Sequence, residues 1–101
     1  MADKYVLKNG EPKKEQDIEK WARWFSKADR RLKETKVGKS TVTTGFLGIN
    51  QGDDDSPSLW ETRILGGRND GKTYQHSSQK KALECHEEVV GMIENELAGQ
   101  L

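Results

Sequence analysis

Residues 41–76 contain three strand-like runs separated by turn residues, and this spacing constrains the fold more than any other feature. The runs are TVTTGFLGI at 41–49, LWETRIL at 59–65 and KTYQH at 72–76. The first two are rich in β-branched, aromatic and aliphatic residues, and the segments between the runs are rich in Gly, Asn, Asp, Ser and Pro. Because such short connections join neighbouring antiparallel strands, the sequence predicts a three-stranded antiparallel meander.

The second run alternates between two faces. Trp60, Thr62 and Ile64 share one face of the predicted strand, and Glu61 and Arg63 share the other. Charged residues in the middle of a strand either face water or line a pocket. Glu61 and Arg63 are therefore candidate ligand contacts if a helix covers their face, and solvated residues if none does.

Two amphipathic helices are predicted around the meander. Apolar residues recur at three- and four-residue steps from about 15 to 35 and again from about 79 to 97, and Ser78 suits the N-cap of the second helix. A short strand is expected at 5–7. Together these elements predict a single α+β domain spanning residues 1–101, with a short N-terminal strand, a helix, the meander and a C-terminal helix, both helices packed on one face of the sheet.

The charges cancel over the whole chain but not within its halves. Seventeen Lys and Arg balance seventeen Asp and Glu, so no net field attracts nucleic acid or an anionic membrane. Residues 1–50 hold twelve basic and seven acidic residues, a net of +5, and residues 51–101 hold five and ten, a net of −5. This asymmetry can make copies attract head to tail, which would give a homo-oligomer, or it can simply give the molecule one basic and one acidic face.

Localisation is expected to be cytoplasmic. The apolar runs are too short to span a bilayer, and the N-terminus lacks the apolar segment of a signal peptide. The single cysteine, Cys85, offers no internal disulfide, which suits a reducing compartment. No membrane partner is expected.

Residues 66–73 read GGRNDGKT, which matches the spelling of a phosphate-binding P-loop. A P-loop needs a helix that begins at its Lys-Thr pair, but here Thr73 leads into YQHSS and helical periodicity resumes only near Gln79. Asn69-Asp70-Gly71 instead supplies residues that tolerate positive φ. The segment therefore predicts a tight hairpin.

Basic residues and a tryptophan line the polar side of the first predicted helix. They could grip phosphates and stack a base, or they could form an ordinary solvated face. The candidate nucleic-acid residues are Lys20, Arg23, Lys27, Arg30 and Arg31. Trp24 flanks this ridge and, with Arg31, is also a candidate contact for a small anionic ligand.

His86 falls within the apolar stripe of the last predicted helix. A histidine there can bind a ligand, or it can be a core residue whose ring is hydrogen-bonded. No metal site is expected, because Cys85 points elsewhere and His76 belongs to another element. The run Asp53–Asp55 lacks the alternating spacing of calcium loops. No cofactor and no catalytic group arrangement is predicted, so we do not expect an enzyme.

The chain resembles a group of small phage and prophage proteins over about residues 4–93. The resemblance lies in WARWF with ADRR, then TTGFLGIN, WETRILGG and ALECHEEVV. The chain departs from that pattern at Gly45 and Arg63, where apolar residues are expected. The resemblance implies no established activity.

A phage-type protein without catalytic motifs is expected to act by binding. The first hypothesis is a non-enzymatic, homo-oligomeric accessory protein that sequesters a nucleotide-like host signalling ligand and so counters host defence, using Trp24, Arg31, Glu61, Arg63 and His86. The second is an interaction module that inhibits a host enzyme through its acidic half. The third is a nucleic-acid-binding protein that uses the basic ridge.

Overall fold

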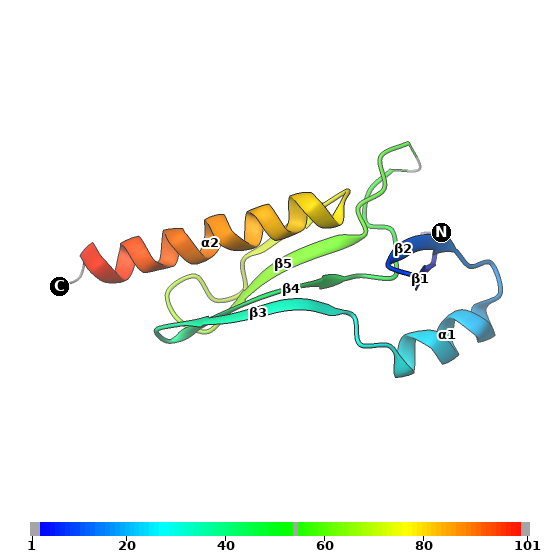
Figure 1. The fold of residues 1–101 in the computed structure, drawn as a ribbon, viewed down its shortest axis with the longest axis horizontal. Helices are drawn as coiled ribbons and strands as arrows, with labels where there is room; N and C mark the ends of the chain where they lie inside the picture. Colours follow the sequence, from blue (N-terminus) through cyan, green and yellow to red (C-terminus); the bar gives the residue numbers. More distant parts are fainter. Residues whose placement is uncertain (1–2, 54, 100–101) are drawn as a thin grey trace.

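The computed structural model describes residues 3–53 and 55–99. Its elements are β1 (Tyr5–Lys8), β2 (Glu11–Lys14), α1 (Ile18–Lys27), β3 (Arg31–Val37), β4 (Ser40–Phe46), β5 (Trp60–Leu65), β6 (Thr73–His76) and α2 (Gln79–Gly99). Strands β1 and β2 form a hairpin, and β3-β4-β5-β6 form a four-stranded antiparallel sheet (Figure 1). The predicted α+β class is confirmed.

The predicted meander contains a further strand. The three predicted strands become β4, β5 and β6, and β3 extends the sheet on the other side of β4. The predicted helix from about 15 to 35 is wrong over residues 31–35, which belong to β3. Helix α1 begins after Asp17, whose carboxylate accepts from the backbone N–H of Glu19 and Lys20, and it ends at Lys27.

The helical periodicity at Ala28 and Leu32 was coincidental. Ala28 has extended backbone angles, and the Asp29 carboxylate accepts from the Arg31 N–H at 3.1 Å, which turns the chain into β3. Because β3 pairs with β4, its backbone groups form hydrogen bonds between the strands. A helix continued through these residues would lose those hydrogen bonds. Thr35 and Val37 are β-branched and suit the strand.

The two helices do not lie side by side on one sheet face, contrary to the prediction. Helix α2 lies along one face of the four-stranded sheet, whereas α1 lies beyond the end of the sheet near the β1–β2 hairpin (Figure 1). Trp21 fixes α1 there, because its indole N–H is shared between the carbonyl oxygens of Tyr5 and Gly48, each at 3.1 Å. The molecule is elongated, 53 × 28 × 24 Å.

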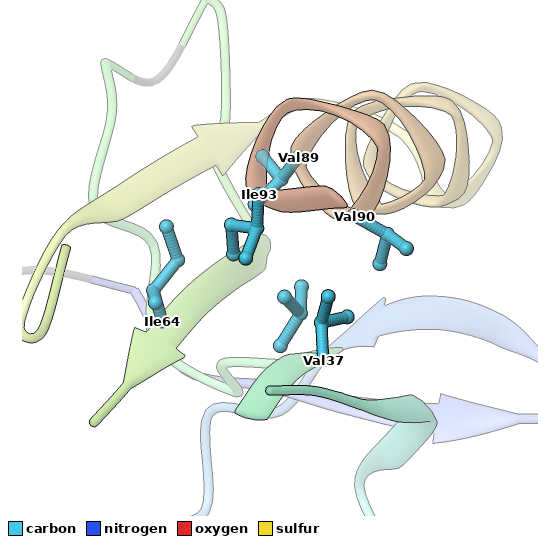
Figure 2. Close-up of a cluster of buried hydrophobic side chains, with 6 residues drawn as sticks. Val37, Ile64, Val89, Val90 and Ile93 are labelled. Atoms are coloured by element: carbon cyan, nitrogen blue, oxygen red, sulfur yellow. The ribbon is translucent and has the colours of Figure 1, made fainter. Parts of the chain in front are cut away.

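The main core lies between α2 and the sheet. Figure 2 shows Val89, Val90 and Ile93 of α2 facing Val37 of β3 and Ile64 of β5. A second buried cluster lies nearer the start of α2 and contains Phe46, Leu59, Trp60 and Ala82. The predicted alternation along β5 is confirmed, since Trp60, Thr62 and Ile64 are buried under α2.

The segment spelling a P-loop is a hairpin, as predicted. Strands β5 and β6 pair antiparallel on either side of it. The Gly71 N–H donates to the Ile64 carbonyl at 2.8 Å, and the Gly66 N–H donates to the Asp70 carboxylate at 2.6 Å. Gly66, Gly67 and Gly71 have φ near +75° to +90° (78°, 74° and 88°), which explains the glycines.

Candidate functional site

A cleft of about 500 Å³ opens on the sheet face that α2 leaves uncovered. Residues 28–30, which connect α1 to β3, and Arg31, the first residue of β3, form one wall, and residues 43–47 form the floor. Glu61 and Arg63 of β5 complete the lining. This is the Arg30 cleft, named after the arginine at its wall.

Gly45 allows the wall to approach the floor. The Phe46 N–H donates to the Arg30 carbonyl oxygen at 2.8 Å, so the connecting segment crosses directly over β4. A Cβ at Gly45 would lie 2.8 Å from that carbonyl oxygen, closer than side chains tolerate. Gly45, where the phage pattern has an apolar residue, therefore fits the local geometry of this chain.

Arg30 is held by two contacts, and one of its nitrogen donors is buried without a partner among the described residues. Its guanidinium lies 3.8 Å from the centroid of the Phe25 ring, and Nη1 donates to the Phe46 carbonyl at 3.2 Å. Its Nε is buried and has no hydrogen-bond partner within residues 3–53 and 55–99. A buried N–H without an acceptor is costly, and an acceptor on a bound ligand would satisfy it if the Arg30 side chain turned toward the cleft.

The other charged residues of the cleft form weak pairs. Arg63 Nη2 lies 3.4 Å from Glu61 Oε1, and Arg31 Nη1 lies 3.3 Å from Glu34 Oε1. Both arginines are exposed, and such surface pairs contribute about 1 kcal/mol or less. A multivalent anion can therefore recruit Arg31 and Arg63 at little cost. Glu61 exposes only 15% of its side chain and supplies an acceptor.

Trp24 does not line the cleft. It is half-buried, and its ring packs edge-on against Phe46 at a centroid distance of 5.9 Å. The remaining candidate basic residues divide into two groups. Lys20, Arg23 and Lys27 are exposed on α1, whereas Arg30 and Arg31 lie at the cleft. The structure therefore does not form the continuous ridge that the sequence suggested.

His86 lies on the opposite side of the sheet from Glu61 and Arg63. It is fully buried, and both ring nitrogens are hydrogen-bonded: Nε2 to Thr35 Oγ1 at 2.9 Å and Nδ1 to Thr44 Oγ1 at 2.8 Å. Thr44 Oγ1 is in turn 2.8 Å from Thr62 Oγ1. This Thr–His network ties α2 to three strands, and the structure does not bring His86 together with the other candidate ligand residues.

Burial lowers the pKa of His86 below its ordinary value of 6.5, and the nearby Lys33 ammonium lowers it further, against a weaker opposing effect of Glu87. The folded protein thus keeps His86 neutral while the unfolded chain takes up a proton below about pH 6.5. The free energy of unfolding is therefore expected to fall as the pH drops from about 7.5 to about 5.5, where the carboxylates remain largely ionised.

Urea unfolding at both pH values tests this prediction. Burial also lowers the pKa of His76, so the comparison needs single variants of both histidines. The decrease in the free energy of unfolding at the lower pH should persist in His76→Asn and become smaller in His86→Gln. An unchanged pH dependence in His86→Gln would contradict the assignment.

Sequence reasoning placed Arg30 only on the nucleic-acid ridge and missed its position in the cleft. The cause was the overlong helix prediction, since residues 28–30 are a connecting segment whose direction depends on the β3–β4 pairing. The only sequence signal for an end of the helix near Arg30 was the polar pair Asp29-Arg30, which follows a segment rich in aromatic residues. Within the described residues, no cluster of three or more His, Cys, Asp or Glu could hold a metal ion.

Comparisons with known proteins give no guide to function: no family model, no curated protein and no solved structure matches this chain. The resemblance to phage proteins therefore stays a prediction. Neither helix in the described part of the chain is long and apolar enough to cross a membrane.

Proposed function

We propose that this protein acts by binding, and that the Arg30 cleft holds a small anionic, nucleotide-like ligand. The observation that carries the proposal is Arg30, a fixed cation whose buried Nε has no partner among the described residues. Arg31 and Arg63 add two more guanidinium groups to the same cleft. Guanidinium groups bind phosphate oxygens through paired, charge-assisted hydrogen bonds.

The other cleft residues suit the remainder of a nucleotide. The Glu61 carboxylate accepts hydrogen bonds, as ribose hydroxyls require, and Thr43 adds a hydroxyl on β4, opposite Arg63. The cleft volume of about 500 Å³ falls within the range of small-molecule sites. Three cations and two acids, Asp29 and the partly buried Glu61, line the cleft, and this mixture favours an anion that also carries hydroxyl groups over a simple phosphate.

The biological role that we propose is sequestration. A homo-oligomeric phage-type protein in the host cytoplasm would hold a host signalling nucleotide and so counter host defence. The resemblance to phage proteins and the opposed charges of the two halves support this role. The cleft lies on an open sheet face, so a second copy packed there would enclose the ligand.

Ligand binding is tested by thermal shift and calorimetry with ADP, GDP and inorganic phosphate as probes. ADP or GDP is expected to raise Tm more than phosphate does. Arg30→Ala and Arg63→Ala should each weaken nucleotide binding about tenfold or more, since each removes a charge-assisted hydrogen bond. Arg30→Lys separates the effect of charge from that of the planar guanidinium.

The matched control is Lys81→Ala, which removes an exposed cation on α2 far from the cleft. It should bind as the parent protein does. Equal nucleotide affinity in Arg30→Ala and in the parent would rule out the cleft. Light scattering after size exclusion tests the oligomer, and a monomer both with and without nucleotide would remove that part of the proposal.

Nucleic-acid binding is the alternative with an observation in its favour, because Lys20, Arg23 and Lys27 are all exposed on α1. It requires retention on DNA that weakens steeply with salt. Loss of retention on replacing these three residues, with Arg30→Ala unaffected, would favour this alternative over the cleft.

A further inference from the structure

A second cavity, the end groove, lies at the opposite end of the sheet from the Arg30 cleft. It has a volume of about 390 Å³ and lies between the β3–β4 turn, the 66–71 hairpin and the last turns of α2. The two cavities share no lining residue. The hairpin that spells a P-loop thus lines a cavity, although not as a P-loop does.

The floor of the end groove is aliphatic. Val37 and Ile93 face each other across the core in Figure 2, and they are 8% and 3% exposed. Leu97, one turn further along α2, is 38% exposed and continues this surface outward. No aromatic residue lines the groove, so it offers an aliphatic side chain good contacts but offers a nucleobase no ring to stack on.

The rim of the end groove carries charges of both signs. Lys39 and Arg68 are exposed and form no ion pair within residues 3–53 and 55–99. Glu96 lies on the α2 side, where the buried Asn69 amide donates to its Oε2 at 2.9 Å. Asn69 therefore holds one carboxylate in place, while two cations remain available across the groove.

The backbone of the groove is fixed by close packing. A Cβ on Gly38 would lie 2.8 Å from Leu97 Cδ1, so the β3–β4 turn packs directly against the end of α2. Ser40 Oγ donates to the Gly66 carbonyl at 3.1 Å, which ties this turn to the hairpin. The site is thus held by contacts among all three of its walls.

We propose that the end groove binds a zwitterionic aliphatic amino acid such as leucine. Lys39 and Arg68 would receive its carboxylate, Glu96 its ammonium group, and Val37, Ile93 and Leu97 its side chain. An aliphatic carboxylate without an amine would place a negative charge near Glu96. An aliphatic amine without a carboxylate would leave Lys39 and Arg68 without an anion to bind. Only a ligand with both charges and an aliphatic side chain matches the whole lining.

Methyl NMR of the full chain tests the proposal with three probes: L-leucine, 4-methylpentanoate, which lacks the amine, and 3-methylbutylamine, which lacks the carboxylate. Leucine is expected to give saturable shifts at the methyl groups of Val37, Ile93 and Leu97. Each analogue should bind about tenfold more weakly or worse, because it loses one charge-assisted contact.

Charge variants locate the contacts. Arg68→Gln should weaken leucine binding and leave 3-methylbutylamine unchanged. Glu96→Gln keeps an acceptor for Asn69 but removes the negative charge. It should therefore weaken the binding of leucine without weakening the binding of 4-methylpentanoate. Leu97→Trp should fill the groove and abolish binding. Lys81→Gln, remote on α2, is the matched control and should bind normally.

Thermal melts confirm that each variant is folded, and Lys39→Gln replaces Arg68→Gln if the latter is not. Three results would overturn the proposal: no leucine-induced shifts up to the solubility limit, equal binding of leucine and 4-methylpentanoate, or leucine-induced shifts at the Arg30 cleft in place of the groove.

Discussion

Replacing His86 with alanine is expected to lower the free energy of unfolding by about 3 to 4 kcal/mol. The ring is 0% exposed, so its loss leaves a cavity between α2 and the sheet. Thr35 and Thr44 also each lose a hydrogen bond to the ring, although Thr44 keeps its contact with Thr62. Chemical denaturation near pH 7.5 measures the loss, since His86 is neutral in both states there.

The matched control is His76→Ala. His76 is only half-buried, and its Nε2 has no hydrogen-bond partner within the described residues, so its removal breaks no such contact. It should cost roughly half as much as His86→Ala or less. Similar losses for the two histidines would show that the Thr–His network contributes little. A double-mutant cycle with Thr44→Val would then show no coupling energy.

Replacing Gly67 with alanine is expected to cost about 2 to 3 kcal/mol. Gly67 has φ of 74°, which penalises any residue with a Cβ by about 1 to 2 kcal/mol. The new Cβ would also overlap Ser40 Oγ, whose hydroxyl donates to the Gly66 carbonyl. Relieving that overlap must move a buried serine and break its bond. Thermal or urea unfolding measures the effect.

Gly71→Ala separates the two causes. Gly71 has φ of 88° in the same hairpin, but a Cβ there meets nothing within 4 Å. It should therefore show only the backbone penalty of about 1 kcal/mol. Equal losses at Gly67 and Gly71 would mean that the contact with Ser40 is not important, and the rigid wall assigned to the end groove would lose its support.

Local sequence patterns predicted most of the sheet. The alternation of Trp60, Thr62 and Ile64 with Glu61 and Arg63 identified β5 and its two faces, because side chains of a strand point to alternate sides. Turn residues at 66–71 identified the β5–β6 hairpin, and the absent helix excluded a P-loop. Ser78 was confirmed as an N-cap, since its Oγ accepts from the Lys81 N–H at 3.2 Å.

The candidate site was predictable only in part. Glu61 and Arg63 were predicted to share one strand face, with the covering of that face left open, and both line the cleft on the face that α2 leaves uncovered. Arg30 could not be placed, because the position of the 28–31 segment depends on its hydrogen bond to Phe46, a residue sixteen positions away. His86 was noticed in its apolar stripe, but the threonines that surround it come from β3 and β4.

By itself, the sequence determined the elements that depend on near neighbours: the periodicity of α2, the alternation of β5 and the glycine-dependent hairpin. The tertiary structure decided where α1 ends, that residues 31–37 form a strand, and which side of the sheet each polar group faces. Residues 28–37 show why. Their local helical periodicity competes with hydrogen bonds to β4. A strand in which six residues pair with β4 satisfies more backbone groups than a frayed helix end does.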